Sequence, residues 1–275
     1  MSEGKKQENG KSFFEKLQDR SMLRSLFLTI ISLVAFLIIW QLASDWLNLA
    51  YLPPPGRVWD ALVLSFQEPD PILGTTMSQN IVASLRRFLV GFALALIVAI
   101  PVGLVMGFSR TFNDLLRPIV EIFRPIPPIA WVPILFVAFS YIWGPVLAIT
   151  IGAFFPIVTS VSFGVRSVEP IYYDAARTQG AGRMAIFEKV VIPFTLPYMM
   201  TGIRIALGVA WMCIIAAEMI MAVGGGIGYY IWYYGFNGPY DNFFAGVIVL
   251  AVLGIITVGL AEYAENYILK ARGMK

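Results

Sequence analysis

The chain has 275 residues, of which 58% are hydrophobic and only 13% are charged, and its formal net charge is +3. About a quarter of the residues in a soluble domain are charged, so this composition excludes an ordinary soluble protein, and the small net charge does not favour a nucleic-acid partner. Histidine is absent and Cys213 is the single cysteine, which excludes Ser-His-Asp and Cys-His catalytic systems, histidine-containing zinc sites and a disulfide framework.

Long apolar runs predict an all-α membrane protein with about six transmembrane helices, because a helix needs about 20 mostly apolar residues to cross a bilayer. In chain order the runs cover residues 25–43, 81–108, 119–141, 145–163, 196–223 and 243–263. The third run is interrupted by Arg124, Pro125, Pro127, Pro128 and Pro133. Proline kinks a membrane helix and frees carbonyl groups that protein or a cavity must satisfy, so we expect a kinked span that lines a cavity.

The first apolar run can be interpreted as a cleaved signal peptide or as a retained membrane span. Residues 1–22 are mostly polar, and no convincing small-residue cleavage site follows the run. We therefore expect a retained span, with residues 1–22 as a cytoplasmic tail and residues 23–275 as the transmembrane domain. Residues 58–66 are expected to form a short interfacial helix.

The distribution of positive charge predicts the orientation, since cytoplasmic loops of membrane proteins are enriched in lysine and arginine. Lysine and arginine gather in residues 5–24, in the links 110–117 and 166–189, and in the tail 270–275. Six spans with both termini in the cytoplasm place all four segments on the same side. Arg86 and Arg87 near the outer end of the second span are the exception, which snorkelling to the interface explains.

The cytoplasmic link between the fourth and fifth spans, residues 166–195, is too long for a simple turn. Its first part has helical spacing, with Asp174 in the first turn, where a carboxylate suits the helix dipole. Gly180 and Gly182 end this helix, and a second amphipathic stretch, 184–191, is expected to stop at Pro193. Four residues of the first helix share one face: Tyr172, Ala175, Ala176 and Gln179.

This link resembles the signature loop of ATP-binding-cassette importer permeases, which reads Glu-Ala-Ala, three residues, Gly, nine residues, then Ile-x-Leu-Pro. Here Asp174, Ala175 and Ala176 are followed by Gly180 at the same spacing, and residues 190–193 end in proline as the motif does. The departures are Asp for Glu and exchanges among aliphatic residues. The resemblance implies that the link is a coupling helix that docks on a separate ATPase. The coupling residues that it implies are Tyr173, Asp174, Ala175, Ala176, Gly180, Ala181 and Pro193.

The same resemblance implies the partners: ABC ATPase subunits, an extracytoplasmic substrate-binding protein, a second permease copy and the lipid of the cytoplasmic membrane. The chain itself is not expected to be an enzyme or to bind a cofactor or metal. ATP and magnesium belong to the partner, because the nearest approach to a phosphate loop, residues 4–12, has five residues between its glycines instead of four and follows no strand.

Further segments resemble the nitrate, sulfonate, taurine and bicarbonate branch of these permeases. They are residues 124–133, 201–207, 216–218 and 226–229, and the resemblance extends from residue 52 to the end of the chain. It implies a small substrate, with an oxyanion such as nitrate, a sulfonate or bicarbonate as the expected class. A glycine-rich turn, residues 224–228, is expected to be either a simple outer turn or part of an outer gate.

Charged residues inside membrane spans are costly, so they are expected to be paired or functional. Glu121 and Arg124 match the depth of Arg204, which predicts a pairing at the inner mouth. Glu218 lies near the depth of Arg86 and Arg87, which predicts a second pairing. Whether these charges fix the helices or contact substrate stays open. The residues expected to line or gate the path are Glu121, Arg124, Trp131, Arg204, Trp211 and Glu218.

Two other classes of protein are alternatives to an importer subunit. An ion-coupled secondary transporter or channel would show inverted repeats and an acidic residue at the midplane, whereas no repeat is evident and the acidic residues lie near the span ends. An intramembrane enzyme is disfavoured because the sequence has no histidine and no paired aspartates within the spans. The coupling loop favours the importer, since a transporter working alone has no use for it.

Overall fold

The computed structural model describes the backbone of residues 4–220 and 225–271, and side chains from residue 24 onward within these ranges, apart from residues 25 and 271. The chain divides into two compact units, residues 1–60 and 61–275. The first contains α1 (Gly4–Leu47) and the start of α2 (Pro55–Gln67). The prediction of a short helix at 58–66 is confirmed by α2.

The apolar part of α1, Leu26–Leu47, is long enough to cross a membrane, and its side chains are almost all exposed, as a lipid-facing helix requires. The chain turns back after this helix. The Trp40 indole donates to the Pro53 carbonyl at 3.0 Å, and the Ser44 hydroxyl donates to the Leu52 carbonyl at 2.8 Å. These bonds tie residues 52–53 to the last turns of α1.

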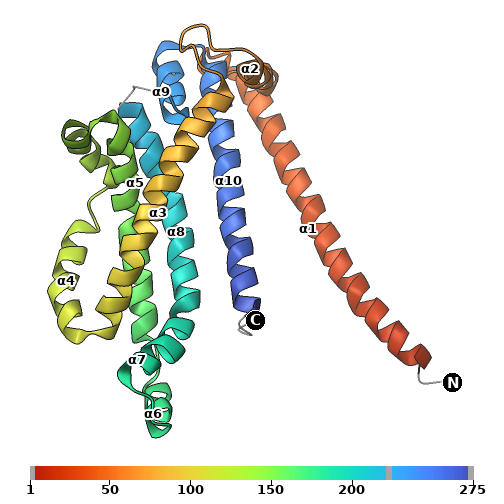
Figure 1. Ribbon diagram of the computed structural model, residues 1–275. Coiled ribbons are helices and arrows are strands. Elements are labelled where there is room, and N and C mark those ends of the chain that lie inside the picture. Colours follow the sequence, from red (N-terminus) through yellow and green to blue (C-terminus); the bar gives the residue numbers. More distant parts are fainter. Residues whose placement is uncertain (1–3, 221–224, 272–275) are drawn as a thin grey trace. The chain divides into compact units, whose positions relative to one another are not determined.

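The second unit, residues 61–275, is a helical bundle (Figure 1). Its α6 and α7 lie at one end, called the coupling end below, and α9 lies at the opposite end. The helices are α3 (Met77–Phe108), α4 (Arg110–Phe123), η1 (Pro128–Trp131), α5 (Val132–Arg166), α6 (Pro170–Thr178), α7 (Arg183–Ile186), η2 (Phe187–Val191), α8 (Ile192–Ile220), α9 (Ile227–Asn237) and α10 (Tyr240–Ala271).

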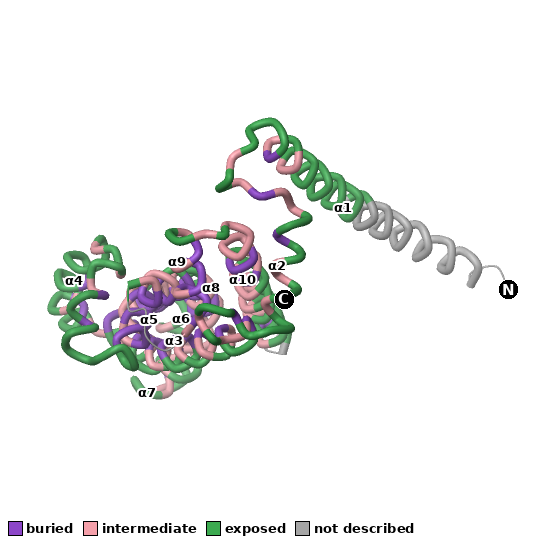
Figure 2. The backbone as a smooth tube through the Cα atoms, turned by 90° about the horizontal axis from the view of Figure 1, so that it is seen from above, coloured by how far each residue is buried: buried purple, intermediate pink, exposed green. Residues whose placement is uncertain are grey.

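The core of the bundle lies where α3, α5 and α8 meet, and Figure 2 shows the buried residues gathered there while α4 is largely exposed. A capping box starts α3: the Gln79 amide donates to the Thr76 hydroxyl at 3.3 Å, and the Thr76 amide donates to the Gln79 side chain at 3.0 Å. Small residues let α3 approach α5 closely. A Cβ on Gly91 would lie 2.6 Å from the Val146 carbonyl oxygen.

Within the described residues, five helical segments are long and apolar enough to cross a membrane, one fewer than predicted. They are Leu26–Leu47, Met77–Phe108, Pro128–Arg166, Arg183–Ile220 and Tyr240–Lys270. The missing one is the third predicted span, 119–141, which is not a continuous helix. It comprises the end of α4, a break at 124–127, η1 and the first turns of α5.

The prolines explain this break, because Pro125, Pro127 and Pro128 have no amide hydrogen to donate. The chain still returns across the bundle here, through α4 and the irregular segment, before α5 runs back toward the coupling end (Figure 1). The two apolar runs 119–141 and 145–163 also place the change of direction between them at about residues 142–144, and this position is displaced. The change of direction lies at Ser140, which has φ 65° and ψ 171°, while Gly144 is buried in the helix that follows.

The predicted helix stop at Pro193 is wrong. Helices α7, η2 and α8 follow one another without a break from Arg183 to Ile220. The five residues of η2 form a π-helical turn, in which the Ile192 amide donates to the Phe187 carbonyl five residues back. Such a turn shifts the hydrogen-bond pattern just before Pro193, so the helix continues through the proline.

Some predicted features lie outside the described residues. They are residues 221–223 of the fifth predicted span, Gly224 of the glycine-rich turn, and Arg272 and Lys275 of the tail.

Candidate functional site

The predicted coupling segment is two short helices separated by a glycine break. Helix α6 ends at Thr178, and Gly180 has φ +79°, a left-handed conformation that favours glycine. Gly182 has φ −73° and caps α7. The helix–break–helix pattern expected from the sequence is therefore present up to Ile186.

The predicted coupling residues divide between two faces of this segment. Tyr173, Ala176 and Ala181 pack with buried residues of the bundle: Val165, Ile186 and Val191. Burial raises the pKa of the Tyr173 phenol, so its hydroxyl keeps its proton.

Asp174 and Ala175 are exposed, and Asp174 lies 3.6 Å from Arg177 in an exposed pair. Exposed apolar residues, Ile171 and Tyr172, complete an outward surface that a partner protein can contact. Pro193 lies inside the continuous helix and is only partly exposed.

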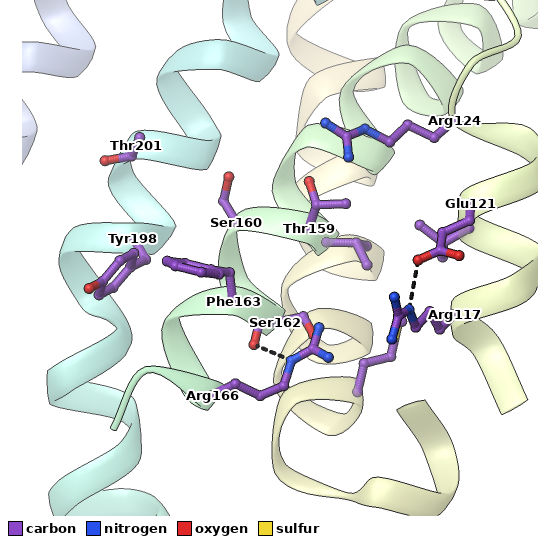
Figure 3. Close-up of a pocket in the computed structure, with 13 residues that line it drawn as sticks. Arg117, Glu121, Arg124, Thr159, Ser160, Ser162, Phe163, Arg166, Tyr198 and Thr201 are labelled. Carbon is purple, nitrogen blue, oxygen red and sulfur yellow. Dashed lines mark hydrogen bonds and ion pairs between the residues drawn. The ribbon is translucent and has the colours of Figure 1, made fainter. Parts of the chain in front are cut away.

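A cleft of about 750 Å³ opens between α4, α5 and α8 near the coupling end (Figure 3). Arg117, Arg124 and Arg166 line it together with one acid, Glu121, so three positive charges and one negative charge leave a formal charge of +2. Arg117 pairs with Glu121 at 2.6 Å on the exposed side of α4. Arg166 donates to the Ser162 hydroxyl at 2.9 Å.

Five hydroxyl groups and several apolar side chains, including Met106, Val158 and Phe163, line the rest of this cleft, and three of the hydroxyls come from the last turns of α5. Among the described residues, neither Arg124 nor Arg166 has a carboxylate partner. Arg166 donates to Ser162 through two of its nitrogens, so Arg124 is the more available of the two to an anion. Arginine and hydroxyl donors around a positively charged cleft suit an oxyanion, because they bind its oxygens through charge-assisted hydrogen bonds. The hydroxyls belong to Thr159, Ser160, Ser162, Tyr198 and Thr201.

Two of the six predicted path residues, Glu121 and Arg124, lie in this cleft, and the predicted pairing of these residues with Arg204 is wrong. Arg204 instead forms ion pairs with two glutamates of α10, at 3.7 Å from Glu262 and in closer contact with Glu265. Glu121 forms its ion pair with Arg117, one turn earlier on the same helix. Glu262 and Glu265 were not among the predicted partners, although their spacing of three places both on one side of a helix.

Two predicted path residues, Trp131 and Trp211, have structural neighbours instead of a place in the cleft. Trp211 is buried, stacks on Phe88 with ring centroids 4.5 Å apart, and donates to the Thr257 hydroxyl at 2.9 Å. Trp131 lies beside Phe123 at 5.9 Å. The predicted path residues do not include Arg117 and Arg166. The signal for them is that charged and hydroxyl side chains recur near the end of α4 and in the last turns of α5, while Tyr198 and Thr201 come from the start of α8.

The sixth predicted path residue, Glu218, is 3% exposed and lies in a polar network at the opposite end of the bundle. Its carboxylate accepts from the Ser84 hydroxyl at 2.8 Å, from the Gly228 amide at 2.9 Å and from Arg87 at 2.8 Å. The pairing expected between Glu218 and the Arg86–Arg87 pair is thus present, and Arg87 makes it.

This network also holds the described part of the glycine-rich turn. Arg87 donates to the Gly225 carbonyl at 2.8 Å, the Gly226 amide donates to the Asn80 side chain at 2.9 Å, and the Ile227 amide donates to the Ser84 hydroxyl at 2.9 Å. Asn80, Ser84 and Arg87 are spaced by four and three residues, so one face of α3 carries all three groups. The turn and the start of α9 are therefore fixed to α3 and α8 through polar groups.

A second anchor ties α9 to the loop before α3. The Tyr234 hydroxyl donates to the Asp70 carboxylate, whose other oxygen accepts from the Ile72 and Leu73 amides at 2.9 Å. Burial, followed by the bond to Asp70, raises the pKa of Tyr234, so this phenol stays a donor. No cluster of metal-ligating side chains occurs among the residues whose placement is described.

The comparison with protein families and curated proteins is consistent with this arrangement. Residues 99–269 match the family described as binding-protein-dependent transport system inner membrane component. A protein of Methanocaldococcus jannaschii named as an ABC transporter permease is 38% identical over 86% of this chain and 90% of its own length. A taurine transport system permease of Escherichia coli is 33% identical over 88% and 90%, and a bicarbonate transport system permease of Synechococcus elongatus is 36% identical over 88% and 87%.

A solved structure with the same fold is the inward-facing MetNI methionine ABC transporter. One of its chains superimposes with a TM-score of 0.58 at 23% identity, over 71% of this chain and 95% of that chain. At this identity the likeness concerns the fold alone.

Proposed function

Because the chain belongs to the family of binding-protein-dependent transport system inner membrane components, we propose that it lines the path by which an ABC importer carries a small oxyanion across the cytoplasmic membrane. The chain is the permease subunit of an ABC importer and a non-catalytic pore component, and ATP hydrolysis belongs to a separate subunit. The substrate class, the orientation and the pairing of two permease copies are the parts that we propose.

The observation that carries the oxyanion proposal is the cleft between α4, α5 and α8. It has a formal charge of +2, two arginines without a carboxylate partner among the described residues, and the hydroxyls of Ser160, Ser162 and Tyr198. The Thr159 and Thr201 hydroxyls donate to backbone carbonyls of their own helices. Nitrate, a sulfonate such as taurine, and bicarbonate all present oxygens that accept from such donors. The names of two relatives, a taurine and a bicarbonate permease, favour the same class.

The coupling segment supports the proposed orientation and the ATPase partner. Its outward surface, formed by Ile171, Tyr172, Asp174 and Ala175, is exposed and partly apolar. We propose that the ATPase contacts this surface in the cytoplasm, with both chain termini on the same side. The cleft lies near the same end, so ATP-driven movement of α6 and α7 is transmitted to α5 and α8, which are continuous with or adjacent to the coupling segment.

A second copy of the chain, facing the first across the cleft, completes the path. The extracytoplasmic binding protein delivers substrate at the end that carries α9.

Uptake by the reconstituted complex tests the substrate class. The permease, its ATPase and its binding protein are placed in liposomes, and ATP-dependent uptake of labelled nitrate, taurine and bicarbonate is measured. Arg124→Gln should reduce uptake of the transported anion about tenfold, since a hydrogen bond to a charged group contributes about 1.5–3 kcal/mol. The control Lys270→Gln removes an equal charge from an exposed site outside the cleft.

Two outcomes would count against the proposal. ATP-dependent uptake of a neutral or cationic solute, with none of the three anions, would remove the oxyanion assignment and leave the permease in place. Equal loss in Arg124→Gln and Lys270→Gln would mean that the cleft is not the path.

A further inference from the structure

A second basic cavity, separate from the cleft, lies at the coupling end. Its volume is about 660 Å³, and it is bounded by the turn between α3 and α4 on one side and by α6 and α7 on the other. Three arginines line it: Arg110 from the start of α4, Arg177 from α6 and Arg183 from the start of α7. The proposed transport path uses none of these residues.

The charge of this cavity is almost uncompensated. No acidic residue lines it. Arg177 pairs with Asp174 at 3.6 Å, and the two side chains are 68% and 71% exposed. Such a surface pair contributes little to stability and neutralises little of the charge. In the part of the chain that the structure describes, Arg110 and Arg183 have no carboxylate partner. Two cations therefore face the cavity freely, together with the hydroxyls of Thr111 and Tyr173.

The other half of the lining is apolar. Phe108, the last residue of α3, packs edge-on against Phe187 with ring centroids 5.1 Å apart, and Ile186 is buried at the base of α7. The 32 residues of α3 span about 48 Å at ~1.5 Å per residue, which exceeds the hydrocarbon thickness of about 30 Å. The end of α3 therefore reaches the headgroup region, so the cavity is basic and apolar at the level where lipid headgroups meet acyl chains.

We propose that this cavity binds the phosphate group of an anionic phospholipid from the cytoplasmic leaflet. Guanidinium groups bind phosphate oxygens through paired hydrogen bonds, and the Thr111 and Tyr173 hydroxyls add donors, while the apolar half accommodates the start of an acyl chain. The inference rests on the proposed function for one point, the assignment of the coupling end to the cytoplasm. Free phosphate offers the same oxygens, so the experiment separates the two sources.

Bound lipid would connect a transmembrane helix end to the coupling segment. Arg110 belongs to the α3–α4 turn, whereas Arg177 and Arg183 flank the break at Gly180. A phosphate held between them would add to the Phe108–Phe187 contact that already joins these elements. The site thus makes the position of α6 dependent on the lipid composition of the membrane.

Lipid binding to the purified full-length chain tests the proposal. Native mass spectrometry in neutral detergent counts the lipids retained after addition of phosphatidylglycerol, phosphatidylcholine or inorganic phosphate. We expect retention of phosphatidylglycerol and not of phosphatidylcholine. Arg110→Gln and Arg183→Gln should each weaken it about fivefold, the factor for one basic residue near an anionic membrane surface. Lys189→Gln is the matched control, because Lys189 is exposed in the same segment but does not line the cavity.

Each further outcome has a defined meaning. Phosphate binding that depends on the same arginines, without phosphatidylglycerol binding, keeps the phosphate site and changes its source to a soluble anion. Equal retention of both lipids, or no effect of either arginine variant, overturns the proposal. If the variants keep phosphatidylglycerol but no longer co-purify with the ATPase, the arginines serve subunit docking and the lipid site is likewise overturned. Because lipid counting needs no transport, a failed uptake experiment would leave this result unaffected.

Discussion

Glu218 and Arg87 form the most deeply buried ion pair of the described residues, with side chains 2% and 16% exposed. A buried pair is tolerated only when its remaining hydrogen-bonding groups are also satisfied. Here Ser84 and the Gly228 amide bond the carboxylate, and the Gly225 carbonyl accepts from the guanidinium. The pair therefore belongs to the hydrogen-bond network that holds the described part of the glycine-rich turn in place.

Glu218→Gln should destabilise the protein by about 3 kcal/mol, since it leaves the Arg87 charge buried without its partner. The measurement is thermal unfolding of the purified permease in detergent. The matched control is Glu121→Gln, which breaks a pair that is about 60% exposed (59% and 60%). Such exposed pairs contribute little to stability because water and salt screen them, so the control should unfold close to wild type. Equal effects of the two substitutions would contradict the role assigned to the buried network.

At the scale of elements, the break between α6 and α7 depends on the conformation of one glycine. Gly180 and Gly182 both have open space where a Cβ would be, so side-chain volume does not distinguish them. They differ in φ, which is +79° at Gly180 and −73° at Gly182. Only Gly180 occupies a region that L-residues avoid.

Gly180→Ala is expected to reduce ATP-coupled uptake roughly fivefold, because a left-handed alanine costs about 1–2 kcal/mol and shifts α6 from its position. Gly182→Ala should leave uptake unchanged, since its φ suits alanine. Uptake and ATP hydrolysis by the reconstituted complex are measured for both variants. Loss of activity in Gly182→Ala to the same degree would show that the segment tolerates no side chain at all, and that conformation is not the cause.

The sequence predicted the elements best where a periodic pattern ended at a special residue. The end of α6 could be placed near Gly180 because the helical spacing stops at a glycine. The expectation that Asp174 lies in the first turn is wrong, since α6 begins four residues earlier, at Pro170. The stop at Pro193 was wrong because proline was taken to end a helix, whereas a π-helical turn lets it continue. The third span was predicted to be kinked at its prolines, and the chain does break there between α4 and η1, but helical periodicity alone did not distinguish a kink from a complete break.

The site residues show the same limit. Glu218 and its arginine partner could be predicted because both occur at one depth and intramembrane charges seek partners. Arg204 had the same property, and depth alone selected the wrong acid, since Glu262 and Glu265 come from another helix at a similar level. Choosing among acids at one depth requires knowing which helices are neighbours.

At the scale of the whole bundle, glycines set the distance between α3 and α5. Gly91, Gly103 and Gly107 all face α5, and an added Cβ would meet an atom of α5 at 2.6, 2.8 and 2.4 Å. Small residues at helix contacts are typical of membrane bundles, where close backbone packing replaces a hydrophobic driving force. The two last glycines have the four-residue spacing of the GxxxG pattern.

Gly91→Ala should destabilise the bundle by about 1–3 kcal/mol, because the new methyl group meets the Val146 carbonyl oxygen and the helices must separate. Gly259→Ala in α10 is the matched control, since nothing lies within 4 Å of its Cβ position. There alanine should stabilise the helix by up to about 1 kcal/mol. Thermal unfolding in detergent gives both values, and a stabilised Gly91→Ala would refute close α3–α5 packing.

The link between Arg87 and Glu218 also constrains how the protein is made. The two residues are 131 positions apart, and at roughly 5–20 residues per second the ribosome needs about 7–26 s to synthesise the chain between them. Throughout that interval α3 carries a cation whose partner does not yet exist. Until α8 has been synthesised, an Arg87 side chain that stays within reach of water or lipid headgroups avoids the cost of an unpaired charge inside the bilayer. The Arg87–Glu218 pair can therefore form only after the C-terminal half of the chain, which supplies Glu218, has been synthesised.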